Sequence, residues 1–111
     1  MNPNRNARHD IILRTIMQFA DMFTAVLKKK QAGQIAEAKY ELEQLYSTAF
    51  GLDYKMILAM DVGTLKTLVG DVFKIRTLIQ VLNEHALLNK SLGNIESSKS
   101  CSKKAEQLEN L

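Results

Sequence analysis

Few side chains in this sequence are suited to acid–base, nucleophilic or metal chemistry. The chain of 111 residues has two histidines, His9 and His85, and one cysteine. A catalytic histidine needs a group that orients it and a nucleophile within reach. Glu84 directly precedes His85, but adjacent positions on a helix do not face each other. We therefore expect a surface or edge histidine, and a carboxylate from another helix beside it would reopen an enzymatic interpretation.

The single cysteine, Cys101, lies close to Lys103 and Lys104, whose charges would lower the pKa of a neighbouring thiol. The alternative interpretation, which we favour, is a small residue in a helix seam. One cysteine and two distant histidines do not have the spacing of a zinc site. The five glycines are isolated, which excludes a phosphate-binding loop. We expect no catalytic residue, no metal site and no cofactor.

Three aspartates, Asp53, Asp61 and Asp71, each precede an apolar segment. A calcium loop would place its ligands at closer, alternating spacing. An aspartate at the start of a helix accepts a backbone N–H of the first turn. We interpret all three as helix N-caps.

The composition is that of one folded domain, which we expect to cover residues 1–111. The chain is 46% apolar and 24% charged, and two separate cores of about 55 residues each would be marginal. One proline and no tryptophan argue against many strands and tight turns. The lone cysteine excludes an internal disulfide framework and is typical of a reducing compartment.

The first apolar stretch does not resemble a signal peptide or a membrane span. Arg14 and Asp21 interrupt it, and far fewer than the roughly 20 apolar residues of a spanning helix remain. We expect a cytoplasmic protein that does not enter the membrane.

Apolar residues at helical three-and-four spacing predict an all-α fold. The first helix is expected from Ile11 to Lys30, with Asp10 as its N-cap. Two long hairpins, over 10–50 and 71–111, would flank a segment of short helices over 53–70. The expected helices after the first cover residues 34–50, 54–60, 62–69, 72–91 and 95–111.

An internal repeat appears when the sequence is compared with itself at an offset of 60 residues. The segment 33–39 lies over 93–99, with Gly33 matching Gly93 and Lys30 matching Lys90. Each copy has a long helix, a Gly-centred turn and a second helix. The repeat therefore predicts two equivalent helical hairpins.

The segment from Gly33 to Leu45, with Ala38 and Leu42 at their spacings, resembles the turn and second helix of a tetratricopeptide repeat. That resemblance implies a stack of antiparallel helical hairpins. The opening from Arg8 to Arg14, with the late Gly93 turn, is similar to a family of short uncharacterised proteins of Gram-positive bacteria. That family is a domain of unknown function with a tetratricopeptide-like fold, so the resemblance implies a shape and no activity.

The formal net charge of +3 resolves into basic ends and an acidic middle. Residues 1–32 carry +4, residues 33–71 carry −3 and residues 72–111 carry +2. A nucleic-acid binder would have a clustered basic face, so we regard nucleic acid as an unlikely partner. The alternative, weak binding to nucleic acid or an anionic surface, would use Arg5, Arg8, Arg14 and Lys28–Lys30.

The function we expect is a non-catalytic protein–protein interaction module. In tetratricopeptide-like folds the first helix of each hairpin lines the concave surface that binds peptides, which would make a polar groove of Lys30, Gln80, Asn83 and Lys90. The two long helices are also more apolar than one neighbour requires. Self-association, most simply as a homodimer, would use Ile11, Met17 and Met22.

Overall fold

The computed structural model describes the backbone of residues 3–110 and the side chains of residues 13–110. Across residues 3–110 the chain is all-α, with no strand. Its helices are α1 (Pro3–Gln31), α2 (Ile35–Phe50), α3 (Tyr54–Ala59), α4 (Val62–Val69), α5 (Val72–Ser91) and α6 (Ile95–Glu109). From residue 34 onward, these bounds agree with the predicted helices to within two residues.

The expected start of the first helix is wrong. α1 begins at Pro3 and continues through Asp10, so Asp10 is not an N-cap. Proline suits the first turn, because the N–H that it lacks has no partner there anyway. No glycine or proline between residues 4 and 31 interrupts the helix.

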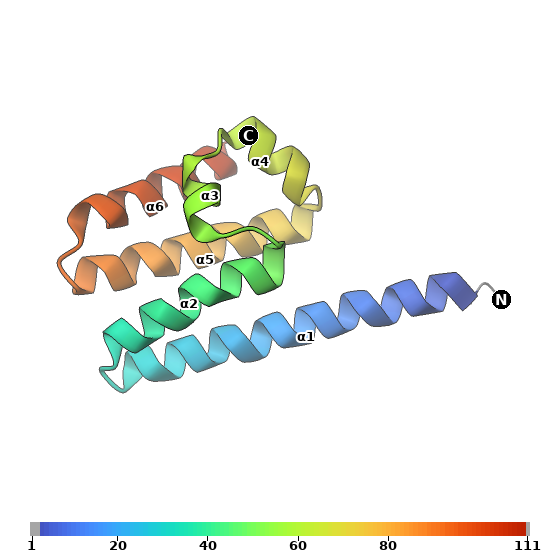
Figure 1. The fold of residues 1–111 in the computed structure, drawn as a ribbon, viewed down its shortest axis with the longest axis horizontal. Helices are drawn as coiled ribbons and strands as arrows, with labels where there is room; N and C mark the ends of the chain where they lie inside the picture. Colours follow the sequence, from blue (N-terminus) through green and yellow to red (C-terminus); the bar gives the residue numbers. More distant parts are fainter. Residues whose placement is uncertain (1–2, 111) are drawn as a thin grey trace.

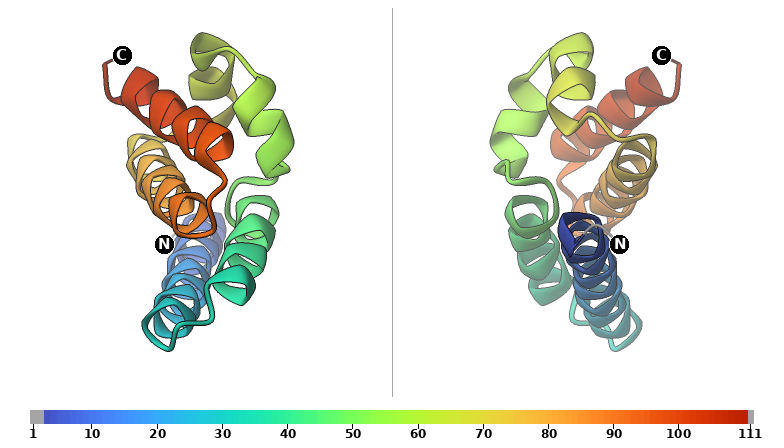
Figure 2. Two further views of the ribbon diagram at one scale, coloured as in Figure 1. Left: turned by 90° about the vertical axis from the view of Figure 1, so that its left-hand side faces the viewer. Right: turned by 90° about the vertical axis from the view of Figure 1, so that its right-hand side faces the viewer.

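The helices form two long antiparallel hairpins, α1 with α2 and α5 with α6 (Figure 1). The hairpins meet where α2 packs on α5. The two hairpin turns lie at the same end of the molecule, and α3 and α4 close the opposite side against α6 (Figures 1 and 2). The expected order of hairpin, short helices and hairpin is therefore the order that the helices follow.

The repeat is visible in the backbone of the two turns. Gly33 and Gly93 have φ angles of 81° and 80°, in the left-handed region. Each donates its N–H to the carbonyl three residues earlier, that of Lys30 or Lys90, over 3.0 Å. The predicted equivalence of the two hairpin turns is confirmed.

The three aspartates cap helices, as predicted. Asp53 accepts from the backbone N–H of Lys55 at 2.8 Å, and Asp71 accepts from that of Lys74 at 3.1 Å. Asp61 accepts from both the backbone and the hydroxyl of Thr64, and these hydrogen bonds lower the pKa of its carboxyl. The caps explain why α3, α4 and α5 begin where they do.

The core is centred on α2, which lies between α1 and α5. Fully buried apolar side chains come from all six helices, but α1 contributes only one among its described residues. They are Val26, Ala38, Leu42, Leu45, Tyr46, Ile57, Leu65, Leu78, Val81, Leu82, Leu88, Ala105 and Leu108. Leu13 and Ala20 follow the apolar spacing of the first helix, but both are exposed.

The exposure of α1 follows from its length. Its 29 residues span about 43 Å, whereas the 16 residues of α2 span about 24 Å. The N-terminal part of α1 therefore extends beyond α2, as Figure 1 shows. The radius of gyration, 14.9 Å, exceeds the value of about 13 Å for a compact domain of this length for the same reason.

The last helix is held by small residues and two polar contacts. Cys101, Ala105 and Leu108 are buried along the predicted seam. The Ser98 hydroxyl donates to the Ala86 carbonyl at 2.8 Å. The Lys104 ammonium donates to the Met60 carbonyl at 2.6 Å, which joins α6 to the end of α3.

Replacement of the turn glycines by alanine tests the equivalence of the hairpins. A Cβ at Gly33 or Gly93 would meet no atom within 4 Å, so the cost is backbone strain alone. We expect Gly33→Ala and Gly93→Ala each to lower the free energy of unfolding by about 1–2 kcal/mol. Gly63→Ala is the control, because Gly63 has no positive φ, and it should be neutral or stabilise by up to about 1 kcal/mol. Urea unfolding measures all three, and a large difference between the two turn variants would contradict the equivalence.

Candidate functional site

A buried polar network joins the two hairpins. His85 on α5 is 1% exposed, and its Nδ1 lies 2.9 Å from the hydroxyl oxygen of Tyr46 on α2. Its Nε2 lies 3.3 Å from Oε2 of Glu43, one turn earlier on α2. Lys39 lies 3.7 Å from the same carboxylate oxygen. The network therefore runs from the surface to the core along the contact between α2 and α5.

The partners of His85 determine which ring nitrogen carries the proton. A carboxylate can only accept hydrogen bonds, so Nε2–H donates to Glu43. The Nδ1 lone pair then accepts the O–H of Tyr46. Burial lowers the pKa of His85 below its ordinary value of 6.5, the Glu43 charge opposes that shift, and Lys39 adds to it. Burial also raises the pKa of Tyr46 well above 10.0, so the hydroxyl keeps its proton.

The expectation of a surface or edge histidine is wrong, because His85 is buried. The signal for its burial was present in the helical spacing. Leu78, Leu82, His85 and Asn89 follow the three-and-four pattern that places residues on one helix face. If only aliphatic residues are counted, the polar side chains His85 and Asn89 on that face are overlooked. The partner on α2 has no local signal, because 39 and 42 residues separate His85 from Tyr46 and Glu43.

A polar cavity of about 300 Å³ opens beside this network, between α2, α3, α5 and α6. Its charged and polar lining includes Lys39, Glu43, Tyr54, Asn89 and Glu96. Asn89 is 1% exposed, and its Oδ1 has no hydrogen-bond partner. Two carboxylates therefore line the cavity, and the Asn89 oxygen is a buried acceptor without a partner behind its wall.

Cys101 also lines the polar cavity, but its surroundings do not activate it. Burial raises the pKa of its thiol to about 11, and the hydrogen bond from Asn89 opposes this shift only in part. The Asn89 Nδ2 lies 4.0 Å from Sγ. The interpretation of Cys101 as a small residue in a helix seam fits its burial, and the expected influence of Lys103 and Lys104 is not among the causes of the shift.

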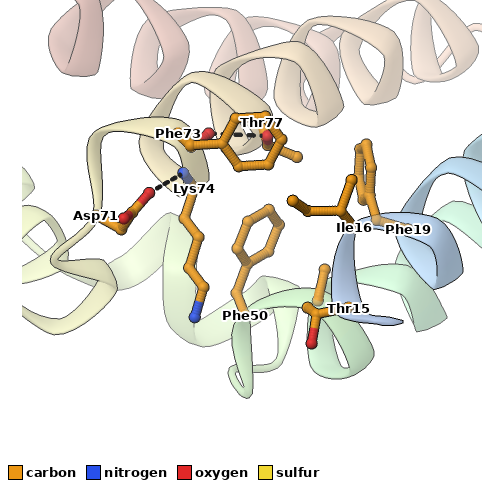
Figure 3. Close-up of a pocket in the computed structure, with 9 residues that line it drawn as sticks. Thr15, Ile16, Phe19, Phe50, Asp71, Phe73, Lys74 and Thr77 are labelled. Atoms are coloured by element: carbon orange, nitrogen blue, oxygen red, sulfur yellow. Dashed lines mark hydrogen bonds between the residues drawn. The ribbon is translucent and has the colours of Figure 1, made fainter. Parts of the chain in front are cut away.

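An apolar cleft of about 350 Å³ lies on the other side of the molecule, where α1 separates from α5. Figure 3 shows Ile16 and Phe19 of α1, Phe50 of α2 and Phe73 of α5 converging on it. Asp71 and Lys74 lie at one edge. No local pattern predicts this cleft, because its walls come from three segments that are far apart in the chain.

The four residues expected to bind a partner do not share one groove. Asn83 and Lys90 line a surface groove between α5 and α6, and Gln80 is exposed on the same helix. Lys30 instead pairs with Glu84 of α5, with 2.7 Å between Nζ and Oε1. Its charge is therefore balanced within the chain.

The three residues expected to drive self-association differ in their surroundings. Met17 is 65% exposed. Met22 is half-buried and packs against the core of its own chain. The side chain of Ile11 lies outside the described residues, as does that of His9.

Metal clusters and membrane-spanning helices are the two further features of interest in the described part of the chain. No cluster of three or more His, Cys, Asp or Glu side chains there is arranged to hold a metal ion. No helix there is both long enough and apolar enough to span a bilayer.

The His85 network predicts a pH-dependent stability. Because the pKa of His85 is lowered on folding, the unfolded chain binds a proton more readily, so this contribution is present above pH 6.5 and is lost as the pH falls from 6.5 through the lower pKa of the folded state. One proton gives a slope of at most about 1.4 kcal/mol per pH unit. Urea unfolding between pH 7.5 and 5.5 measures it.

Two glutamine variants separate the histidines. His85→Gln should flatten the slope, and His9→Gln should keep it. An unchanged slope in His85→Gln would contradict the assignment of the neutral buried histidine.

Comparison with known proteins does not extend this description. No protein-family model, no curated protein and no solved structure matches the chain. What the protein does must therefore be inferred from its own residues and their geometry.

Proposed function

We propose that this protein is a non-catalytic protein–protein interaction module that self-associates through the outer face of α1. The observation that supports this proposal is a long helix with its outer apolar side chains uncovered. Leu13 and Met17 are 43% and 65% exposed, and Ala20 is exposed beside them. Large apolar side chains that lie together on an uncovered helix face mark contact sites.

The apolar cleft adds to the surface that a partner would cover. Phe73 lines it and is itself exposed, as is the neighbouring Val72. Ile16 and Phe19, on the side of α1 that faces the cleft, are half-buried. A partner lying along α1 would therefore shield apolar side chains of both α1 and α5.

Two charges on α1 indicate that the partner is a second copy of this chain. Arg14 and Asp21 are exposed and seven residues apart, so they share one side of the helix, two turns from each other. Met17 lies between them. Neither charge forms an ion pair with another described residue. The midpoint between Arg14 and Asp21 falls next to Met17, and opposite charges on either side of a midpoint suit a two-fold axis.

An antiparallel pair of α1 helices satisfies both features. A two-fold axis beside Met17 places the two Met17 side chains together and sets Arg14 level with the partner subunit's Asp21. The same axis sets Asp21 level with the partner subunit's Arg14, because an isologous contact repeats each pair. Ala20 then lies between the levels of the two ion pairs, and Leu13 lies one position beyond Arg14. This arrangement replaces Met22 of the expected set by Leu13 and Ala20.

The chemistry of the polar network supports a non-catalytic role. Both ring nitrogens of His85 are engaged, one with Tyr46 and one with Glu43. The thiol of Cys101 keeps its proton at neutral pH, since its pKa is about 11. A general base needs a free nitrogen lone pair, and His85 has none. Its hydrogen bond to Glu43 therefore serves to join α5 to α2.

The alternative function is binding to nucleic acid or an anionic surface. It would depend on lysines whose charge is largely balanced within the fold. Lys29 lies 2.7 Å from Glu41 and 3.6 Å from Glu37. Lys30 pairs with Glu84. Two of the three lysines in the basic run are therefore neutralised by the chain itself, which favours a protein partner.

We also propose that the two hairpins are a tetratricopeptide-like stack. The matching turns at Gly33 and Gly93 and the packing of α2 on α5 support this proposal. The role of Lys30, Gln80, Asn83 and Lys90 in binding a further partner stays a prediction, and the groove at Asn83 and Lys90 is its best-supported part.

Exchange of the two charges tests the proposed dimer. Light scattering at high micromolar concentration and low salt should give about 25 kDa, twice the chain mass of 12.5 kDa. Arg14→Asp and Asp21→Arg should each weaken association about tenfold or more, because like charges then face each other twice. The double variant Arg14→Asp/Asp21→Arg should restore it.

Arg76→Asp is the matched control, since Arg76 is an exposed arginine on α5, and it should associate like the wild type. A wild-type protein that stays at 12.5 kDa would overturn self-association. A dimer that both single variants retain would overturn the antiparallel α1 contact.

A further inference from the structure

We infer that the surface groove between α5 and α6 binds an acidic amphipathic helix of a partner protein, in the way that the first hairpin binds α5. This inference rests on the proposed role as an interaction module, and it adds a second surface to the outer face of α1. The groove has a volume of about 450 Å³. Its exposed lining residues are Asn83, Leu87, Lys90, Ile95, Lys99 and Ser102.

The internal repeat identifies the surface to which this groove corresponds. At the offset of 60 residues, each exposed lining residue has a counterpart in the first hairpin. The counterparts are Phe23, Leu27, Lys30, Ile35, Lys39 and Leu42, and each of them is buried or half-buried. The same surface is therefore covered in the first hairpin and uncovered in the second.

The helix that covers the first copy of this surface is α5. It packs against α2, and Leu42 lies in the core between them. The Lys30 ammonium pairs with Glu84 of α5 at 2.7 Å. Stacked repeats cover each hairpin with an element of the next one in this way. The first hairpin thus provides the model for a helix seated on the groove of the second.

The charge of the groove indicates an acidic occupant. Both groove lysines, Lys90 and Lys99, have counterparts that pair with carboxylates in the first hairpin. Neither groove lysine forms an ion pair with another described residue. Glu43, the partner of Lys39, is replaced by Lys103 in the second copy. Like charges one helical turn apart repel each other, so carboxylates of a partner would stabilise this end of α6.

The apolar side chains of the groove favour a helix over a nucleic acid or another phosphate-bearing surface. Leu87 and Ile95 are 49% and 47% exposed, and Leu92 in the adjoining turn is 39% exposed. An amphipathic helix covers such side chains with apolar residues at three-and-four spacing and carries its charges along the edge. Phosphate groups would pair with the lysines and leave these apolar side chains in water.

A synthetic helix tests the groove. The probe is an acetylated and amidated peptide with the sequence of residues 75–91 and the changes Arg76→Glu and Gln80→Glu, at two exposed positions of α5. Together with Glu84, these changes place carboxylates at i,i+4 spacing beside the apolar face that packs on the first hairpin. The control peptide contains the same residues in scrambled order, so its charge is the same.

In calorimetry with the full chain, the probe should bind at least about tenfold more tightly than the control peptide, because only the probe forms an amphipathic helix. Equal binding of the two peptides would overturn recognition of a helix. Failure of the probe to bind would overturn the groove as its site.

Three variants of the chain locate the contact. Lys90→Glu and Leu87→Ser should each weaken binding of the probe about tenfold, because one reverses a charge and the other removes an apolar contact. Lys28→Glu is the matched control, an exposed lysine on α1, and should leave binding unchanged. An equal loss in Lys28→Glu and Lys90→Glu, or unchanged binding in Leu87→Ser, would show attraction by charge alone and overturn the proposal.

Light scattering separates this inference from the proposed dimer. Lys90→Glu and Leu87→Ser should both keep the dimer mass of the wild type. A chain that binds the probe but stays monomeric would support the groove and overturn only the α1 contact. A dimer that is lost in Lys90→Glu would show that a second copy occupies the groove, which would overturn the partner helix.

Discussion

Burial of a neutral histidine between α2 and α5 is the constraint on which the rest of the fold depends. His85 can enter the core only if both ring nitrogens find partners. Tyr46 and Glu43 supply them from two successive turns of α2, which sets the register of one hairpin on the other. An apolar contact would tolerate sliding by part of a turn, whereas this pair of directed hydrogen bonds does not.

The sequence was sufficient for the helices but not for their assembly. Aspartate caps and turn glycines are local signals, so the bounds from residue 34 onward and the repeated turns at Gly33 and Gly93 were predictable. The start of α1 was not predictable. Aspartate favours the N-cap position, but no residue between Pro3 and Asp10 stops the helix, so it begins before Asp10. The apolar spacing of α1 correctly predicted a helix but not which of its residues are buried. Burial depends on the length of the neighbouring α2, which the spacing in α1 cannot indicate.

The same distinction applies to the candidate sites: features within one helix were predictable, and features that combine several helices were not. The seam at Cys101 follows from small residues at helical spacing within α6. The contacts of His85, the polar cavity and the apolar cleft each combine helices that are distant in the chain, so no local pattern predicts them. Lys30 is an example. It was predicted to bind a partner through its charge, but Glu84, 54 positions away in the sequence, balances that charge.

The narrow contact between the hairpins has a mechanical consequence. α2 and α5 form the main connection, while α1 and α5 diverge on either side of the apolar cleft. The α2–α5 contact therefore sets the angle between the two hairpins, and α1, about 43 Å long, extends the first hairpin away from that contact. A difference of a few degrees in that angle would displace the far end of α1 by several ångströms, because the helix is so long. Small changes at His85 would thus be amplified at the tip of α1.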